Sequence, residues 1–176
     1  MTTRTILITG IMAAGKSTVA EHLAHRFPKS VHLRGDTFRR MIVQGRAEMR
    51  SDASAEAFAQ LELRYKIAAA AADLYLAAGF SVVYQDVIIG PALGDVVSYH
   101  RHRPLHVIVL CPSPRAVATR ESNRGKVGYH GFAVEELDRV LRAETPRIGL
   151  WLDTSDLTVD ETVDRIVEDM ELSRVS

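Results

Sequence analysis

The stretch Gly10-Ile11-Met12-Ala13-Ala14-Gly15-Lys16-Ser17 decides the fold, because it joins a short apolar run to an amphipathic helical pattern. It matches the spacing G-x-x-x-x-G-K-[ST], whose glycines permit backbone angles that other residues resist. The loop can then turn its N–H groups inward as a cradle for phosphate. The helix that begins near Lys16 adds its positive dipole end. The stretch therefore predicts a strand, a phosphate-binding loop and a helix in succession.

This loop predicts where a nucleotide would bind. Lys16 would reach the β and γ phosphates of ATP, and the Ser17 hydroxyl would coordinate Mg²⁺. The alternative is a glycine-rich turn without a ligand, which the strand before the loop and the helix after it argue against. We therefore expect a Mg·ATP site formed by Gly10, Ala13, Ala14, Gly15, Lys16, Ser17 and Thr18.

Strands and helices alternate along the rest of the chain. Short apolar runs predict strands at residues 5–9, 31–33, 80–85, 105–111 and 150–152. Helical spacing and capping signals predict helices at 17–27, 37–44 and 54–78, after Ser113-Pro114, and after Thr158. This alternation implies an α/β fold, with a parallel sheet covered on both faces. Ligands of such sheets bind at the carboxyl ends of the strands.

The composition is that of one globular domain. Of the 176 residues, 47% are apolar, and 22 basic residues balance 22 acidic ones. Neither nucleic acid nor a membrane surface is therefore favoured as a partner. Cys111 is the single cysteine and no signal-peptide pattern is present, so we expect a cytoplasmic protein. His100 and His102 lack a cysteine or an acid at ligand spacing and are expected on a surface loop.

A polar group follows the second predicted strand. Asp36 would lie near the phosphate-binding loop and is a candidate general base for an acceptor hydroxyl. Arg39 and Arg40 could hold an anionic or polar acceptor, because a guanidinium binds an oxyanion through two hydrogen bonds. Only one of the two is expected to face the site. The alternative is that Asp36 caps the helix and the arginines are solvated.

Another acid, Asp86, ends the third predicted strand. An acid at this place resembles the group that holds Mg²⁺, directly or through water, and it would also border the acceptor. The alternative is a loop aspartate that caps a turn. Asp86 competes with Asp36 for the role of general base, and the sequence leaves both open.

Cations also follow the fourth predicted strand. Arg120 and Arg124 lead from a helix into a loop that contains glycine, with Lys126 beyond them. Such a loop could close over ATP, where its cations would neutralise charge as the γ-phosphoryl group is transferred. The alternative is a solvated basic helix face. Residues 120–132 are the expected lid, and residues 36–66, including Arg64, are the expected acceptor side.

Together these motifs resemble the adenylate-kinase-like group of P-loop kinases, over most of residues 1–176. Within that group the chain is most similar to chloramphenicol phosphotransferase-like proteins, through its Met-Thr-Thr-Arg start, Asp86-Val87 with a glycine at 90, and Arg120-Glu121-x-x-Arg124-Gly125. The resemblance implies a three-layer α/β/α P-loop NTPase fold, a five-stranded parallel sheet of order 2-3-1-4-5, and a small lid. It also implies that Asp36 is the base.

The function implied is transfer of the γ-phosphate of Mg·ATP to a hydroxyl of a small molecule, such as an antibiotic, a sugar or an aminocyclitol. The same Asp-x-x-Arg arrangement occurs in zeta-toxin-like sugar-nucleotide kinases, polynucleotide 5′-kinases and adenylylsulfate kinases. Polynucleotide or nucleotide-sugar kinases are therefore alternatives, as is a nucleotide-binding switch without an acceptor. Arg39 and Arg40 depart from what a neutral antibiotic needs, which favours an anionic or sugar-like acceptor.

Overall fold

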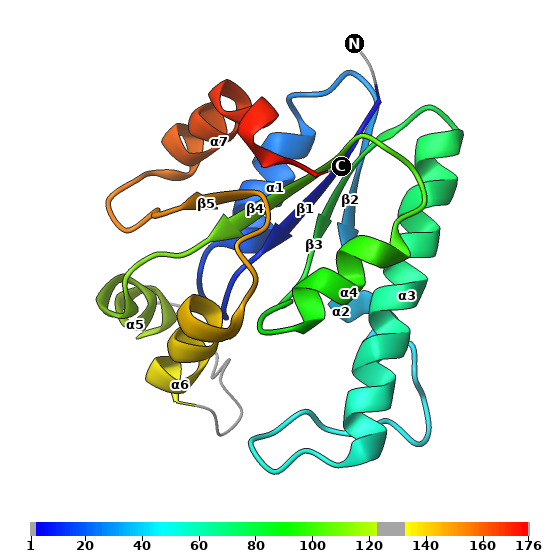
Figure 1. The fold of residues 1–176 in the computed structure, drawn as a ribbon, viewed down its shortest axis with the longest axis vertical. Helices are drawn as coiled ribbons and strands as arrows, with labels where there is room; N and C mark the ends of the chain where they lie inside the picture. The colour runs from blue at the N-terminus through cyan, green and yellow to red at the C-terminus, as the bar shows by residue number, and fades with distance from the viewer. Residues whose placement is uncertain (1–2, 123–132, 176) are drawn as a thin grey trace.

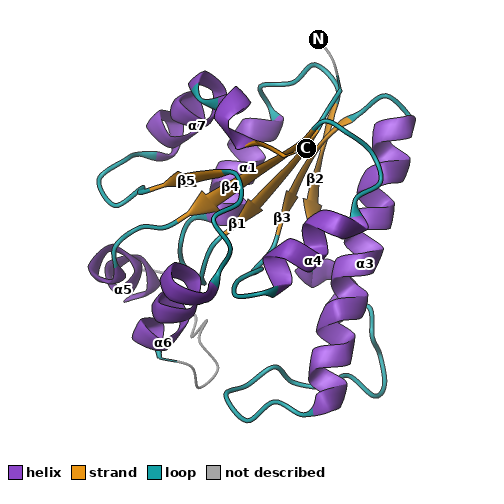
Figure 2. Cartoon of the chain, viewed as in Figure 1, coloured by secondary structure: helices purple, strands orange, loops and turns teal. Residues whose placement is uncertain are grey.

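A computed structural model describes residues 3–122 and 133–175 and shows a parallel sheet between two layers of helices (Figure 1, Figure 2). Its strands run in the order β2-β3-β1-β4-β5, all parallel, as the resemblance implied. The strands are β1 (Thr5–Thr9), β2 (Ser30–Arg34), β3 (Ser81–Gln85), β4 (Leu105–Leu110) and β5 (Leu150–Leu152). A short strand, β6 (Arg174–Val175), was not predicted and pairs antiparallel with β4.

Helices cover both faces of the sheet. One face packs against α1 (Lys16–Ala24) and α7 (Val159–Glu168), which share an apolar cluster. The other carries α3 (Ala55–Ala77), α4 (Ala92–Tyr99) and α6 (Val134–Arg139), the last continued by a π-helical turn, Val140–Glu144. The remaining helices are α2 (Asp36–Arg40), α5 (Pro114–Ser122) and the 3-10 turn Met170–Ser173. None of the helices in the described ranges is long and apolar enough to cross a bilayer.

Some predicted boundaries were wrong. The helix predicted at 37–44 ends at Arg40, because Met41 and Val43 are exposed and give no packing that would continue it. The short helices α4 and α6 were not predicted from the sequence. By contrast, α7 begins at the predicted capping box, in which Thr158 and Glu161 satisfy each other's backbone N–H groups.

The parallel register places all strand ends at one edge of the sheet. Ile8 of β1 and Arg34 of β2 are both aligned with Gln85 of β3. The phosphate-binding loop, Asp36 and Asp86 follow these ends directly. The fold therefore brings together three segments that are far apart in the sequence.

His100 is buried, so its prediction as a surface residue was wrong. Its ring lies 6.0 Å from the ring of Tyr84, and neither ring nitrogen has a hydrogen-bond partner among the described residues. Burial lowers the pKa of His100 to about 4, against an opposing effect of Asp73. The imidazole is therefore neutral in the folded protein near pH 7.

We predict that His100 makes folding stability depend on pH. Its pKa rises from about 4 to 6.5 on unfolding, so the unfolded chain binds the extra proton and stability falls as pH drops from about 6.5 towards 4. Between pH 7 and pH 5, urea unfolding of the wild type should lose about 2 kcal/mol more than unfolding of His100→Phe. Equal losses in the two proteins would contradict the assignment.

Candidate functional site

The phosphate-binding loop has the backbone that its glycines predict. Gly10 and Gly15 have φ values of 147° and 95°, and Ala13 adopts a φ of 60°, which is uncommon outside glycine. A Cβ atom on Gly10 would lie 2.5 Å from the carbonyl oxygen of Leu110, so β4 also requires glycine there. These turns bend the chain into a concave loop before α1 begins.

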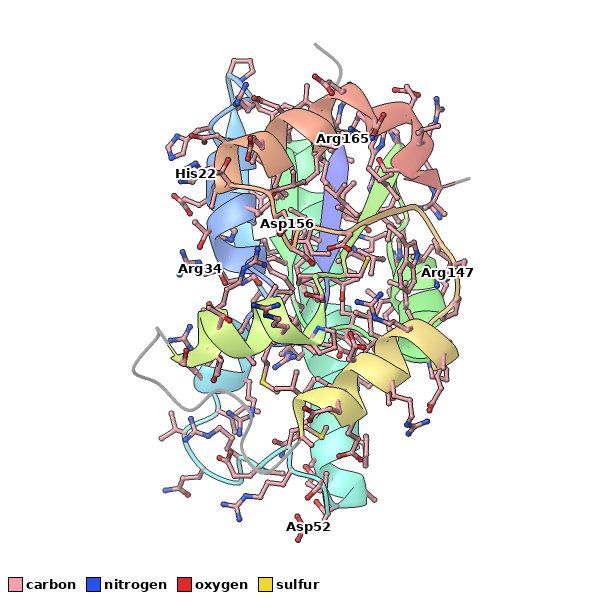
Figure 3. The ribbon with its side chains drawn as sticks, turned by 90° about the vertical axis from the view of Figure 1, so that its left-hand side faces the viewer. His22, Arg34, Asp52, Arg147, Asp156 and Arg165 are labelled. Atoms are coloured by element: carbon pink, nitrogen blue, oxygen red, sulfur yellow. The ribbon has the colours of Figure 1, made fainter. Side chains whose placement is uncertain are left out.

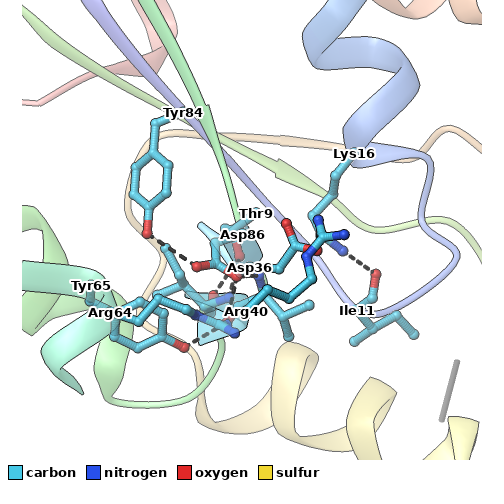
Figure 4. A network of polar contacts seen from close by, with 11 residues as sticks. Thr9, Ile11, Lys16, Asp36, Arg40, Arg64, Tyr65, Tyr84 and Asp86 are labelled. Atoms are coloured by element: carbon cyan, nitrogen blue, oxygen red, sulfur yellow. Dashed lines mark hydrogen bonds and ion pairs between the residues drawn. The ribbon is translucent and has the colours of Figure 1, made fainter. Parts of the chain in front are cut away.

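Lys16 is buried in this loop. Its Nζ donates a hydrogen bond of 2.7 Å to the carbonyl oxygen of Ile11, as Figure 4 shows. Ser17 follows in the first turn of α1, where backbone N–H groups lack intrahelical acceptors. The loop thus carries an ammonium group, a hydroxyl and a helix N-terminus around one concave surface.

Two cavities flank the loop, and Ala13 and Gly15 line both. The larger has a volume of about 700 Å³ and extends towards α2 and α3. The smaller has a volume of about 290 Å³ and lies against α1 and the start of α7, with walls that include Thr18, Val19, Arg120, Thr154, Leu157 and Val159. The loop therefore separates two spaces that open on different elements.

Asp36 lies on the larger cavity at the first position of α2. Its side chain is 54% exposed and accepts a 2.8 Å hydrogen bond from Arg40. Arg39 points to other partners, the carboxylate of Glu48 at 2.6 Å and the carbonyl oxygen of Ala47 at 3.3 Å. Both arginines line the cavity, whereas we expected only one to face it.

Asp86 lines the same cavity, but its carboxylate is buried and engaged. One oxygen accepts hydrogen bonds from Arg64 at 2.7 Å and from the Val87 N–H at 2.8 Å, and Tyr84 donates to the other at 3.3 Å (Figure 4). Burial raises the pKa of Asp86, and the charge of Arg64 opposes this effect only in part.

Two tyrosines complete this network. Tyr65 donates a 2.6 Å hydrogen bond to the carbonyl oxygen of Val87, beside the bond from Tyr84 to Asp86. Burial raises the pKa of both phenols, so both stay neutral donors. Arg64 was only a weak candidate in the sequence. The usable signal is its position one helical turn before Ala68 and beside Tyr65, which are both buried residues of α3.

Arg120 lies at the smaller cavity. Its guanidinium donates to the carbonyl oxygens of Thr154 at 2.5 Å and Ala14 at 3.4 Å, which links α5 to the phosphate-binding loop. The predicted lid cations Arg124 and Lys126 lie outside the described residues. The expected contact of Arg120 with the transferred phosphoryl group stays a prediction.

Within the described ranges, no three His, Cys, Asp or Glu side chains form a group that could hold a metal ion. Both predicted metal ligands, Ser17 and Asp86, border the larger cavity. Since both Asp86 oxygens accept hydrogen bonds, this donor set fits an ion that is bound mainly by phosphate and water, as Mg²⁺ commonly is.

Charges of both signs lie on the face of the molecule that carries α5, α6 and α7. Figure 3 shows this face, with the cations Arg34, Arg147 and Arg165 and the acids Asp52 and Asp156 labelled. Arg26 pairs with Asp164, and Arg165 pairs with Asp169. This face therefore gives no support to an extended basic channel for an oligonucleotide.

A family model described as an AAA domain matches residues 6–146. No protein in the search of curated sequences matches the chain. Among solved structures, the tunicamycin resistance protein of Deinococcus radiodurans is similar, with a TM-score of 0.72 and 17% identity over 99% of both chains. A sugar kinase of Janibacter sp. HTCC2649 has a TM-score of 0.69 and 17% identity over 97% of this chain and 96% of its own.

A third similar structure is the APS kinase of Mycobacterium tuberculosis in complex with AMPPNP and APS. Its TM-score is 0.70 at 17% identity, and the match covers 96% of this chain and 98% of that one. At such identities the three likenesses establish the fold that the chains share.

We predict that Gly35→Ala destabilises the protein through Asp86. The φ of Gly35 is −62°, which any residue adopts, but an added Cβ would lie 1.9 Å from the Asp86 carboxylate and displace it from Arg64. We expect urea unfolding to show a loss of about 1–3 kcal/mol.

Gly94→Ala is the matched control, because nothing lies within 4 Å of a Cβ placed there in α4. It should be neutral or stabilise the protein by up to about 1 kcal/mol. Equal stabilities of Gly35→Ala and the wild type would show that Asp86 moves without cost.

Proposed function

Because the chain belongs to the AAA domain family, we propose that it is a P-loop kinase that transfers the γ-phosphoryl group of ATP to a hydroxyl of a small molecule. The observation that carries the proposal is the pair of cavities on either side of the loop 10–17, with Asp36 and Lys16 both on the larger one. A kinase needs this division, because it binds a nucleotide and an acceptor with the transferred group between them.

The smaller cavity suits the nucleotide base. Val19, Leu157 and Val159 give it apolar walls, and the Arg120 guanidinium offers a flat cation against which a base can stack. The phosphates would then lie along the loop, with Lys16 leaving the Ile11 carbonyl to meet them. Bound Mg²⁺ would neutralise phosphate charge, held by the Ser17 hydroxyl and, through water, by Asp86.

Asp36 is the general base in this proposal. Its exposed carboxylate can take the proton of the acceptor hydroxyl, and Arg40 fixes its position through their 2.8 Å hydrogen bond. The acceptor oxygen forms a bond to the γ-phosphorus as the bond to the bridging oxygen of ADP breaks. That oxygen keeps the electron pair. Asp86 suits this role less, because both its oxygens are already hydrogen-bonded.

We predict that Lys16→Ala loses phosphoryl transfer, because the variant lacks the ammonium group that would contact the phosphates from the loop. Transfer of label from γ-labelled ATP to a panel of hydroxylated antibiotics, sugars, aminocyclitols and nucleosides should fall by at least about 100-fold. Turnover near that of the wild type would contradict the nucleotide site.

We predict that Asp36→Asn separates nucleotide binding from transfer. ATP affinity should change by less than about threefold, whereas labelling of the acceptor should fall by about 10²–10⁴-fold, as loss of a general base does. Asp95→Asn, an exposed aspartate on α4, is the control and should keep both. If Asp86→Asn alone showed this behaviour, the base would be Asp86.

A further inference from the structure

The described arginines on the larger cavity are all paired with acids. Three guanidinium groups of the described residues line it, and each contacts a carboxylate that lines the same cavity at 2.6–2.8 Å: Arg39 with Glu48, Arg40 with Asp36, and Arg64 with Asp86. Lys16 is the remaining described cation on the wall, and it belongs to the phosphate-binding loop. The acceptor side of this cavity therefore has no net charge in the described residues.

These pairs differ in how readily a ligand could break them. Arg64 and Asp86 are 12% and 4% exposed, and separating a buried pair costs several kcal/mol. Arg40 and Asp36 are 62% and 54% exposed, and an anionic acceptor that drew Arg40 away would remove the partner that positions Asp36. Arg39 is held by Glu48 and by the Ala47 carbonyl oxygen, while Arg46 approaches Glu48 at 3.8 Å from outside the wall.

Apolar side chains make up much of the remaining wall. They come from several separate parts of the chain: the phosphate-binding loop, the segment between α2 and α3, α3, the segment after β3, the start of α4, and α6. The principal ones are Met12, Phe58, Leu61, Ile89 and Leu137. Such a wall favours a ligand that buries apolar surface when it binds.

Phe58 is the unusual member of this wall. Phe58 is 58% exposed, although the removal of a phenyl ring from water is favourable. It lies on the first turns of α3, on the same cavity as Asp36. An exposed aromatic ring in a cavity provides a surface on which a flat apolar group can stack.

We propose that the acceptor is an uncharged hydroxyl compound that carries an apolar, ring-sized group, and that Phe58 determines this preference. The proposal rests on the proposed function, since it takes the larger cavity as the acceptor site. It narrows the expectation of an anionic or sugar-like acceptor to an uncharged one, because Arg39 and Arg40 are already compensated by acids.

The test compares three β- or α-linked glucose derivatives that keep the same free hydroxyls and differ at the anomeric carbon: p-nitrophenyl β-D-glucoside, methyl β-D-glucoside and glucose 1-phosphate. Their binding to the full chain with Mg²⁺ and AMPPNP is measured by calorimetry. The aryl glucoside should bind at least about 10-fold more tightly than either of the others. In Phe58→Ser this preference should shrink to less than about threefold.

Leu74→Ser is the matched control. Leu74 is also an exposed apolar residue of α3, at 73%, but it does not line the cavity, so the preference should survive. Glucose 1-phosphate binding as tightly as the aryl glucoside would overturn the proposal. So would a preference that persists in Phe58→Ser, or no binding of the aryl glucoside at about 10 mM.

Transfer of γ-label to the same three compounds is measured in parallel and tests the proposed function separately. Preferential binding of the aryl glucoside without labelling of any compound supports the acceptor class and counts against phosphoryl transfer. Labelling of glucose 1-phosphate in preference to the aryl glucoside supports transfer and overturns the acceptor class.

Discussion

The backbone of the loop 10–17 is the constraint on which the rest of the site depends. It must turn its N–H groups towards one point, so Gly10, Ala13 and Gly15 adopt positive φ values. The close approach of Gly10 to the Leu110 carbonyl holds one end of the loop against β4, and α1 holds the other. With the loop fixed in this way, the spaces on its two sides become separate cavities.

Charge compensation organises the larger of these cavities. Asp86 is buried beside Gly35, and the missing Cβ of that glycine leaves the room its carboxylate occupies. Arg64 supplies the opposite charge from α3, which ties the helix to the end of β3. Asp86 is thereby held in this network, while the Asp36 carboxylate stays exposed on the cavity. We propose different roles for the two acids because their surroundings differ.

Much of this arrangement could be predicted from local sequence. The loop motif and the strand runs depend on neighbouring residues, so Gly10, Lys16 and the five parallel strands were placed correctly. Features set by distant contacts were missed. The ion pair between Arg64 and Asp86 joins residues 22 positions apart, and the burial of His100 depends on packing against Tyr84. Short helices such as α4 carry too few turns for a clear periodic pattern.

A crystal structure of the full chain with Mg²⁺ and AMPPNP tests the central claim most directly. We expect the nucleotide base to lie in the smaller cavity beside Arg120 and the phosphates to follow the loop 10–17. Lys16 Nζ should leave the Ile11 carbonyl oxygen and bind a phosphate oxygen. The larger cavity, with Asp36, should then remain open to an acceptor. A nucleotide base bound in the larger cavity, or phosphates bound away from Lys16, would contradict this assignment of the nucleotide site.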